Sequence, residues 1–175
     1  LRGSRKEKRY KFMTGANFYI TNYEAVIAEL QRIKRFCKSR KVAVVLDESA
    51  RIKDPSTKTA QALFQLIPFS MKRIIITGTP VANKPFDLWS QFYFLDEGKL
   101  LGSDFDGFKA KFNERDPYYK EHLQELKAVV TNHSIRRCKD EVLELPEKKF
   151  INCYVELSGK QLDLYNELRE ELRIE

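Results

Sequence analysis

Two short runs of apolar residues constrain the fold of this chain more than any other feature. Val42–Leu46 and Arg73–Thr77 are nearly continuous in apolar side chains, and a turn and a helical stretch separate them. Such runs are typical of strands that are covered on both faces, as in a parallel sheet. Strands that alternate with helices further indicate right-handed crossover connections. We therefore expect an α/β fold with a parallel sheet and flanking helices.

The spacing of apolar residues predicts the elements around these strands. A β-like run at Ala16–Thr21 precedes a helix over Tyr23–Cys37, and Ser56 can cap a helix that reaches Leu66. From Phe86 onward helices predominate, with an aromatic core helix over 86–94 and further helices near 106–112 and 118–131.

Near the C-terminus the pattern changes again. Phe150–Leu157 alternates apolar and polar residues, which predicts a strand with Cys153 on its buried face. Ser158 and Gln161 form a capping-box pattern that is typical of a helix start, and a final helix is expected to follow.

Composition and charge exclude several classes of protein. No apolar run approaches the roughly 20 residues that span a bilayer, and no secretory signal is seen, so we expect a soluble intracellular protein. The three cysteines lack the spacing of a disulfide scaffold or a zinc site. Residues 1–41 contain twelve Lys and Arg residues against three acids, a balance of +9, and the rest of the chain sums to −2. This asymmetry indicates a polyanionic partner, with a solvated helix face and a basic tail as the alternative.

An acidic pair, Asp47 and Glu48, directly follows the first apolar strand. Ligands of open parallel sheets bind outside the carboxyl ends of the strands. One carboxylate there can hold hydrated Mg²⁺, and the other can orient and deprotonate a water that attacks a phosphate. Alone, the pair is also compatible with an ordinary strand end.

A turn with two hydroxyls, Thr77-Gly78-Thr79-Pro80, ends the second apolar strand. If the strands are parallel neighbours, this turn lies on the same sheet edge as the acidic pair. It can then hydrogen-bond near the acids and transmit the state of a bound nucleotide. Alone, this turn too is compatible with a simple strand end.

Taken together, these segments resemble the remodeller-type (Swi/Snf) branch of helicase superfamily two. Leu46–Lys53 is similar to that family's motif II with its basic tail, and Arg73–Asn83 is similar to motif III. Asp87–Leu95 matches the helix after motif III, and Ile20–Glu24 is similar to motif Ib. Downstream, the match continues through Ile135–Val142, Leu145-Pro146, Leu157-Ser158, Gln161 and Leu164-Tyr165.

The resemblance implies a fold and a set of roles. It implies an incomplete RecA-like lobe over residues 1–95, a helical protrusion over 96–145, and a strand-helix connector towards a second lobe over 146–175. Asp47 would hold Mg²⁺ and Glu48 would be the general base. The residues that would couple hydrolysis to lobe movement are Thr77, Gly78 and Thr79. Those that would contact nucleic acid are Thr21, Asn22, Tyr23, Arg51 and Lys53. Arg136 and Arg137 would lie between the lobes.

The sequence departs from the family pattern in two ways. Ala50 stands where many relatives have His or Gln, so we expect coupling towards motif III to run through Ser49 or the backbone. No Gly-x-x-x-x-Gly-Lys-Ser/Thr pattern is present to cradle the ATP phosphates, and the family's arginine finger belongs to a second lobe. We therefore expect the 175 residues alone to be inactive.

Three functions remain in consideration. The first is part of a DNA-stimulated ATPase that uses ATP and Mg²⁺ and translocates on duplex DNA, with contacts mainly to phosphates. A protein–DNA complex that is remodelled is a further candidate partner. The second is a non-enzymatic nucleic-acid-binding module with a degenerate ATP site, which would dock through Arg2–Lys11 and the basic helix. The third is a doubly wound metabolic enzyme with an acidic Mg²⁺ site. For the first, we expect a cytoplasmic protein of bacterial or phage-like origin, or a nuclear one if eukaryotic.

Overall fold

The computed structural model describes residues 15–81, 84–138, 144, 146 and 149–172. The chain forms two compact units, Leu1–Ser134 and Ile135–Glu175, and each is described by itself. The basic arm Arg2–Lys11, the end of the motif III segment at 82–83 and residues 139–143 lie outside the described residues. The predicted division at residues 95 and 145 stays a prediction.

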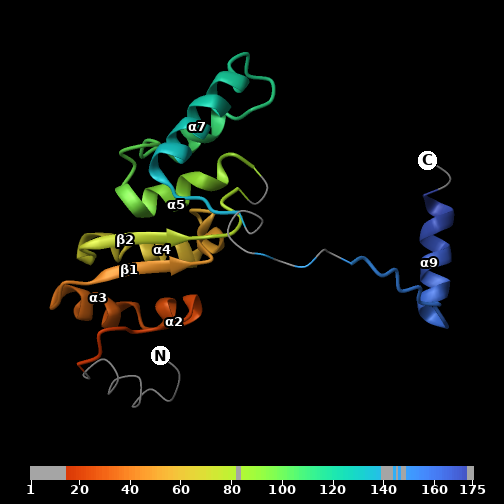
Figure 1. Cartoon of the computed structure of the whole chain (residues 1–175), viewed down its shortest axis with the longest axis horizontal. Helices are drawn as coiled ribbons and strands as arrows, with labels where there is room; N and C mark the ends of the chain where they lie inside the picture. Colours follow the sequence, from red (N-terminus) through yellow and green to blue (C-terminus); the bar gives the residue numbers. More distant parts are fainter. Residues whose placement is uncertain (1–14, 82–83, 139–143, 145, 147–148, 173–175) are drawn as a thin grey trace. The chain divides into compact units, whose positions relative to one another are not determined.

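The two apolar runs form the sheet of the first unit (Figure 1). β1 (Ala43–Asp47) and β2 (Lys72–Ile76) pair in parallel, and the register runs from Ala43 opposite Lys72 to Asp47 opposite Ile76. Both strands were predicted, and the parallel pairing is confirmed. β1 begins and ends one residue later than expected, so that Asp47 is the last residue of the strand. The described residues thus form an α/β unit.

The crossover between the strands contains two 3-10 turns, η1 (Ser49–Ile52) and η2 (Ile67–Phe69), and the helix α4 (Lys58–Phe64). The predicted cap was wrong by one residue. Thr57 caps α4 by accepting a hydrogen bond from the Ala60 amide at 3.3 Å, while Ser56 donates its amide and hydroxyl to the Asp54 carboxylate. Because Ser56 is held in that turn, its side chain does not reach the first turn of the helix.

The segment before the sheet differs from the sequence prediction in two respects. Residues 16–21 do not form a strand, and the Phe18 side chain is 89% exposed, because no strand among the described residues pairs with this run. The predicted single helix is two helices, α2 (Tyr23–Ala28) and α3 (Leu30–Lys38). They are separated at Glu29, whose φ of −112° and ψ of 15° interrupt the α-helical geometry.

One face of the sheet packs into the first hydrophobic cluster. Leu46 is buried in this cluster, and Val44 and Ile75 are half-buried beside it. The elements around the sheet contribute the other buried residues of the cluster, which are Val26, Ile52, Ala60, Leu63, Leu66, Ile67 and Phe94. The opposite face exposes Val45, Ile74 and Ile76. Coverage of both faces was therefore a wrong prediction for the described residues, whose helices pack on one face only.

Arg73 ties β2 to the surrounding elements. Its guanidinium donates to the carbonyl oxygens of Leu95 and Ile67 at 2.9 and 3.1 Å, and to a carboxylate oxygen of Glu97 at 3.0 Å. A planar guanidinium with five fixed donors can serve three acceptors at once. This side chain therefore holds the end of α5 (Asp87–Asp96) close to the sheet.

A second hydrophobic cluster joins α5 to α6 (Phe105–Ala110) and α7 (Tyr119–His133). Trp89 stacks on Tyr93 with ring centroids 4.8 Å apart, and its indole N–H donates to the Gly102 carbonyl at 3.0 Å. The aromatic helix is thus core packing, as predicted. Both later helices are confirmed within one or two residues of their expected starts.

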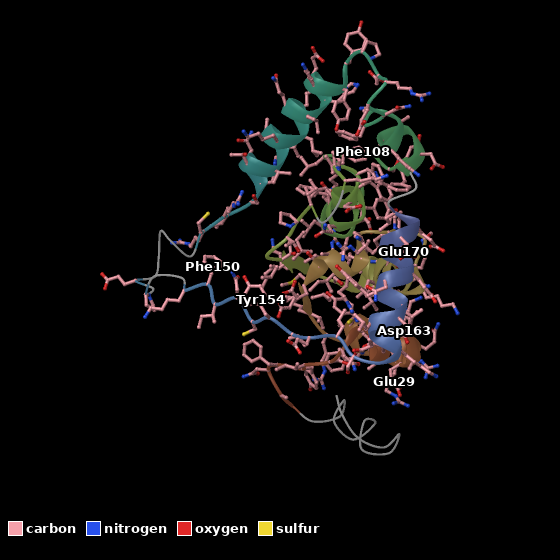
Figure 2. All side chains as sticks on the ribbon, turned by 90° about the vertical axis from the view of Figure 1, so that its right-hand side faces the viewer. Glu29, Phe108, Phe150, Tyr154, Asp163 and Glu170 are labelled. Carbon is pink, nitrogen blue, oxygen red and sulfur yellow. The ribbon has the colours of Figure 1, made fainter. Side chains whose placement is uncertain are left out.

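The second unit contains the helix α9 (Lys160–Glu171) after an extended segment. The strand predicted over 150–157 is absent there, and Figure 2 shows Phe150 and Tyr154 on that segment, with Tyr154 93% exposed. Cys153 is likewise exposed and not buried, because this run has no partner strand among the described residues of its unit. The expected capping box is also wrong: Gly159 occupies the N-cap position with φ 56°, and no side chain caps the helix.

Among the helices in the described part of the chain, none is both long enough and apolar enough to cross a bilayer.

Candidate active site

The register of the sheet brings the two predicted site segments together. Asp47 pairs with Ile76 at the carboxyl ends of the parallel strands, so Glu48 and Thr77 are the first residues beyond the same edge. Thr77 is half-buried, and Gly78 and Thr79 are exposed at that edge. The sheet therefore places the acidic pair beside the hydroxyl-bearing turn, as a site at the carboxyl ends of parallel strands requires.

Glu48 has an unusual backbone conformation. Its φ of 52° and ψ of 51° lie in the left-handed region, which costs a residue with a side chain about 1–2 kcal/mol. Its carbonyl accepts a hydrogen bond from the Arg51 amide at 3.0 Å, which holds the start of η1 against Glu48. Strain of this kind concentrates at functional sites, and here it turns the chain sharply after Asp47.

Both carboxylates are exposed at the sheet edge. Oδ1 of Asp47 accepts a hydrogen bond from the Glu48 amide at 3.0 Å. Within the described part of the chain, neither acid belongs to an ion pair. The two carboxylates are thus not paired in structural salt bridges, and they are exposed to solvent.

The acidic pair fits Mg²⁺ better than a metal that needs a protein cage. In the described ranges, no group of three or more His, Cys, Asp or Glu residues is arranged to hold a metal ion. Mg²⁺ keeps several waters and is commonly held by one or two carboxylates together with substrate phosphates. An exposed Asp47 next to a second carboxylate matches that donor set.

Tyr23 connects the start of α2 to the acidic pair. Its hydroxyl donates to the carbonyl oxygen of Asp47 at 2.6 Å. Burial, reinforced by the negative charge of Asp47, raises the pKa of Tyr23 above its ordinary value of 10.0. The hydroxyl therefore remains a donor below pH 10, and its contribution to stability is lost only as the pH rises through that raised pKa.

The other residues predicted to contact nucleic acid lie around this link. Thr21 and Asn22 are exposed, and the Asn22 side chain caps α2 by accepting from the Ala25 amide at 2.9 Å. Arg51 forms an exposed ion pair with Glu24 at 3.0 Å, and Lys53 is half-buried. The contact shown between this group and Asp47 is that of the Tyr23 hydroxyl, whereas contact with nucleic acid stays a prediction.

A buried polar link that the motif analysis missed joins the two halves of the site. The Ser49 hydroxyl donates to Oε1 of Gln91 at 2.7 Å, and Nε2 of Gln91 donates to the Pro80 carbonyl at 2.8 Å. The available signal was a glutamine within the aromatic run of α5, where a polar side chain needs a buried partner. Ser49 itself was expected to take part in coupling.

Comparison with known proteins decides the family. A model of the SNF2-related domain matches residues 2–174. The chain belongs to the SNF2-related domain family. The superfamily-two resemblance drawn from the motifs is thereby confirmed.

Similar proteins include chromatin-remodelling and repair factors. The SNF2-related domain described here is 32% identical over 164 residues to the CHD3-type chromatin-remodeling factor PICKLE of Arabidopsis thaliana, covering 91% of this chain and 11% of that protein. It is 33% identical over 159 residues to the DNA excision repair protein ERCC-6-like of Bos taurus, covering 83% and 12%. It is 30% identical over 178 residues to the ISWI chromatin-remodeling complex ATPase ISW1 of Saccharomyces cerevisiae, covering 97% and 15%. The chain thus spans between 11% and 15% of these three relatives.

The origin of these relatives bears on the expected source. All three are eukaryotic proteins, so they lend no support to a bacterial or phage-like origin.

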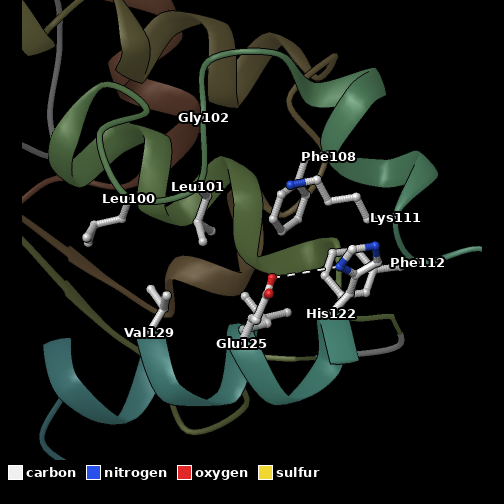
Figure 3. A pocket seen from close by; sticks show the side chains of 10 residues that line it. Leu100, Leu101, Gly102, Phe108, Lys111, Phe112, His122, Glu125 and Val129 are labelled. Carbon is white, nitrogen blue, oxygen red and sulfur yellow. Dashed lines mark ion pairs between the residues drawn. The ribbon is translucent and has the colours of Figure 1, made fainter. Parts of the chain in front are cut away.

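Arg136 and Arg137 are exposed in the second unit, and their inter-lobe role stays a prediction. A hollow of about 250 Å³ lies between α6, α7 and the loop after α5, with Leu101, Phe108 and Val129 among its walls (Figure 3). None of the predicted site residues lines it. The hollow is therefore separate from the acidic pair.

Proposed function

We propose that this SNF2-related domain is part of a DNA-stimulated ATPase that couples ATP hydrolysis to movement along duplex DNA. The observation that carries the proposal is the parallel register that places Asp47 and Glu48 beside Thr77–Pro80. Relatives named as a chromatin-remodelling ATPase and as chromatin-remodelling and repair factors support it. A glycine-lysine phosphate loop and a second lobe with an arginine finger would have to be supplied outside these 175 residues.

In this proposal the two acids divide the work of hydrolysis. Asp47 would hold hydrated Mg²⁺, and the ion would supply positive charge that neutralises the phosphates of ATP. Glu48 orients the attacking water and accepts its proton, and its left-handed backbone turns the chain at this point. Thr77, Gly78 and Thr79 lie at the same edge and couple the hydrolysis of ATP to the movement of the lobes.

The proposed division of the chain follows from these roles. Residues 1–95 are the partial first RecA-like lobe, 96–145 the helical protrusion, and 146–175 the connector that leads to the second lobe. Arg136 and Arg137, near the end of the protrusion segment, are the proposed inter-lobe residues. The chromatin-remodelling relatives favour the nuclear alternative for the localisation.

DNA is proposed to contact the domain through Thr21, Asn22, Arg51 and Lys53. Thr21, Asn22 and Arg51 are exposed and Lys53 is half-buried, and each offers the hydroxyl, amide or cationic groups that contact phosphates. The link from the Tyr23 hydroxyl to the Asp47 carbonyl gives DNA bound there a direct connection to the acidic pair. A protein–DNA complex that is remodelled would bind the domain through the same contacts to its DNA.

Stimulation by DNA should fall steeply with salt and depend little on base sequence. Phosphate contacts release counterions, so a site of about four contacts should lose roughly 100-fold in apparent DNA affinity between 50 and 200 mM salt. The measurement is the ATPase rate of a protein containing this domain against DNA concentration, on duplexes of unrelated sequence at several salt concentrations. Stimulation that ignores salt, or that needs one sequence, would contradict the phosphate-contact model. DNA binding without any ATP turnover would favour the non-enzymatic module instead.

A further inference from the structure

We propose that Gln91 is a positioning residue that ties the Thr77–Pro80 turn to the acidic pair through a hydrogen-bond relay, Ser49–Gln91–Pro80; this rests on the proposed ATP site. Ser49 directly follows Glu48, and Pro80 directly follows Thr79. The two ends of the relay are therefore one residue from the proposed base and one residue from the proposed coupling hydroxyl. Displacement of either segment strains the hydrogen bonds to the other.

The orientation of the Gln91 amide follows from its partners. Nε2 lies 2.8 Å from the Pro80 carbonyl oxygen and 3.1 Å from the Asp87 carbonyl oxygen, and both of these groups can only accept. The amide nitrogen, which has two protons, must therefore face them. Oε1 is left to accept from the Ser49 hydroxyl at 2.7 Å. A reversed amide would set oxygen against two carbonyls, so only one orientation is stable.

Burial makes this relay stiff. Ser49 and Gln91 are both 0% exposed, so water cannot replace a broken hydrogen bond between them, whereas the bond from Gln91 to the exposed Pro80 is partly buried. A buried polar group without a partner is strongly unfavourable, which opposes any movement that separates the two segments. The relay also supplies the polar connection that the methyl side chain of Ala50, next to Ser49, cannot make.

The position of Gln91 on α5 extends the consequence beyond the site. The same helix contributes Phe94 to the first cluster and Leu88, Trp89 and Phe92 to the second. A helix fixed in both clusters moves as one piece. Gln91 thereby fixes the positions of the acidic pair and the turn relative to each other. It also fixes them relative to the helices α6 and α7.

The first test needs no ATP hydrolysis. The Thr79 amide donates to the Thr77 hydroxyl at 3.1 Å, so its hydrogen exchange reports the order of the turn. In the 175-residue chain, Gln91→Met keeps a similar length but removes all three hydrogen bonds. Exchange of the Thr79 amide should become about tenfold faster. Ser49→Ala should act in the same direction with a smaller effect, and it decides the question if Gln91→Met does not fold.

Gln61 offers a matched control. Its Nε2 donates to the Pro55 carbonyl at 2.7 Å, but this bond is exposed on α4. Gln61→Met removes the same type of bond and should leave Thr79 exchange unchanged. Equal exchange in wild type, Gln91→Met and Ser49→Ala would overturn the relay.

The second test separates positioning from structure. In an ATPase that contains this domain, Gln91→Met should lower the DNA-stimulated kcat about tenfold and leave KM for ATP within about twofold, because the relay orders the turn and does not touch nucleotide. Faster Thr79 exchange with an unchanged kcat would overturn the positioning role. If the wild type hydrolyses no ATP, the proposed function fails, and the exchange experiment still decides whether the relay holds the turn.

Discussion

Replacing Glu48 by Gln in an ATPase that contains this domain should lower kcat by roughly 10²–10⁴-fold and leave nucleotide binding nearly unchanged. The amide has the size of the carboxylate but cannot accept the proton of the attacking water. Asp47, which is proposed to hold the metal ion, is untouched by the change. The measurement is steady-state turnover together with the dissociation constant of a fluorescent ATP analogue.

A control with the same chemical change lies far along the chain. Glu121 is exposed in the first turn of α7, so Glu121→Gln removes one carboxylate without touching the sheet edge. Its kcat should stay within about twofold of the wild type, since isolated surface substitutions have small effects. A Glu48→Gln protein with normal kcat would exclude Glu48 as the base. A protein that loses turnover and nucleotide binding together would assign it to binding.

Replacing Phe94 by Ala should lower the free energy of unfolding of the first unit by about 3–5 kcal/mol. The Phe94 side chain is 0% exposed and belongs to the first cluster, which also contains Leu46 of β1 and the half-buried Ile75 of β2. Removal of its ring leaves a cavity that the surrounding α4 and β1 side chains fill only in part. A loss of this size is a large fraction of the stability of a typical domain.

Urea unfolding, monitored by tryptophan fluorescence, measures the change in the free energy of unfolding of the first unit. Trp89 is the single tryptophan and is buried on the same helix as Phe94. Phe18→Ala is the matched control, because that phenylalanine is 89% exposed and should shift the midpoint little. Equal midpoints for the two variants would show that the first cluster does not hold the sheet.

Much of the site could be predicted because its information is local. Continuous apolar runs identified both strands, and a parallel pairing forces their carboxyl ends onto one edge. That Asp47 and Thr77 lie close to each other follows from those two facts alone. The aromatic helix was likewise identified, since Trp89 and its neighbours recur at helical spacing.

The errors arose where a pattern needs a partner from elsewhere in the chain. Alternation at 16–21 and 150–157 is typical of strands, but a strand exists only when another strand pairs with it, and none does so in the described residues. The relay through Gln91 was missed for a related reason. Its partners, Ser49 and Pro80, lie 42 and 11 residues away, and only the packing of α5 against the sheet edge brings them together.

The most direct test of the central claim is the structure of an ATPase containing this domain, bound to Mg²⁺ and a non-hydrolysable ATP analogue. The account predicts that the terminal phosphate and the metal ion lie at the sheet edge, with Asp47 and Glu48 on one side and the Thr77–Pro80 turn on the other. A nucleotide bound away from that edge, with both carboxylates facing solvent, would contradict the account.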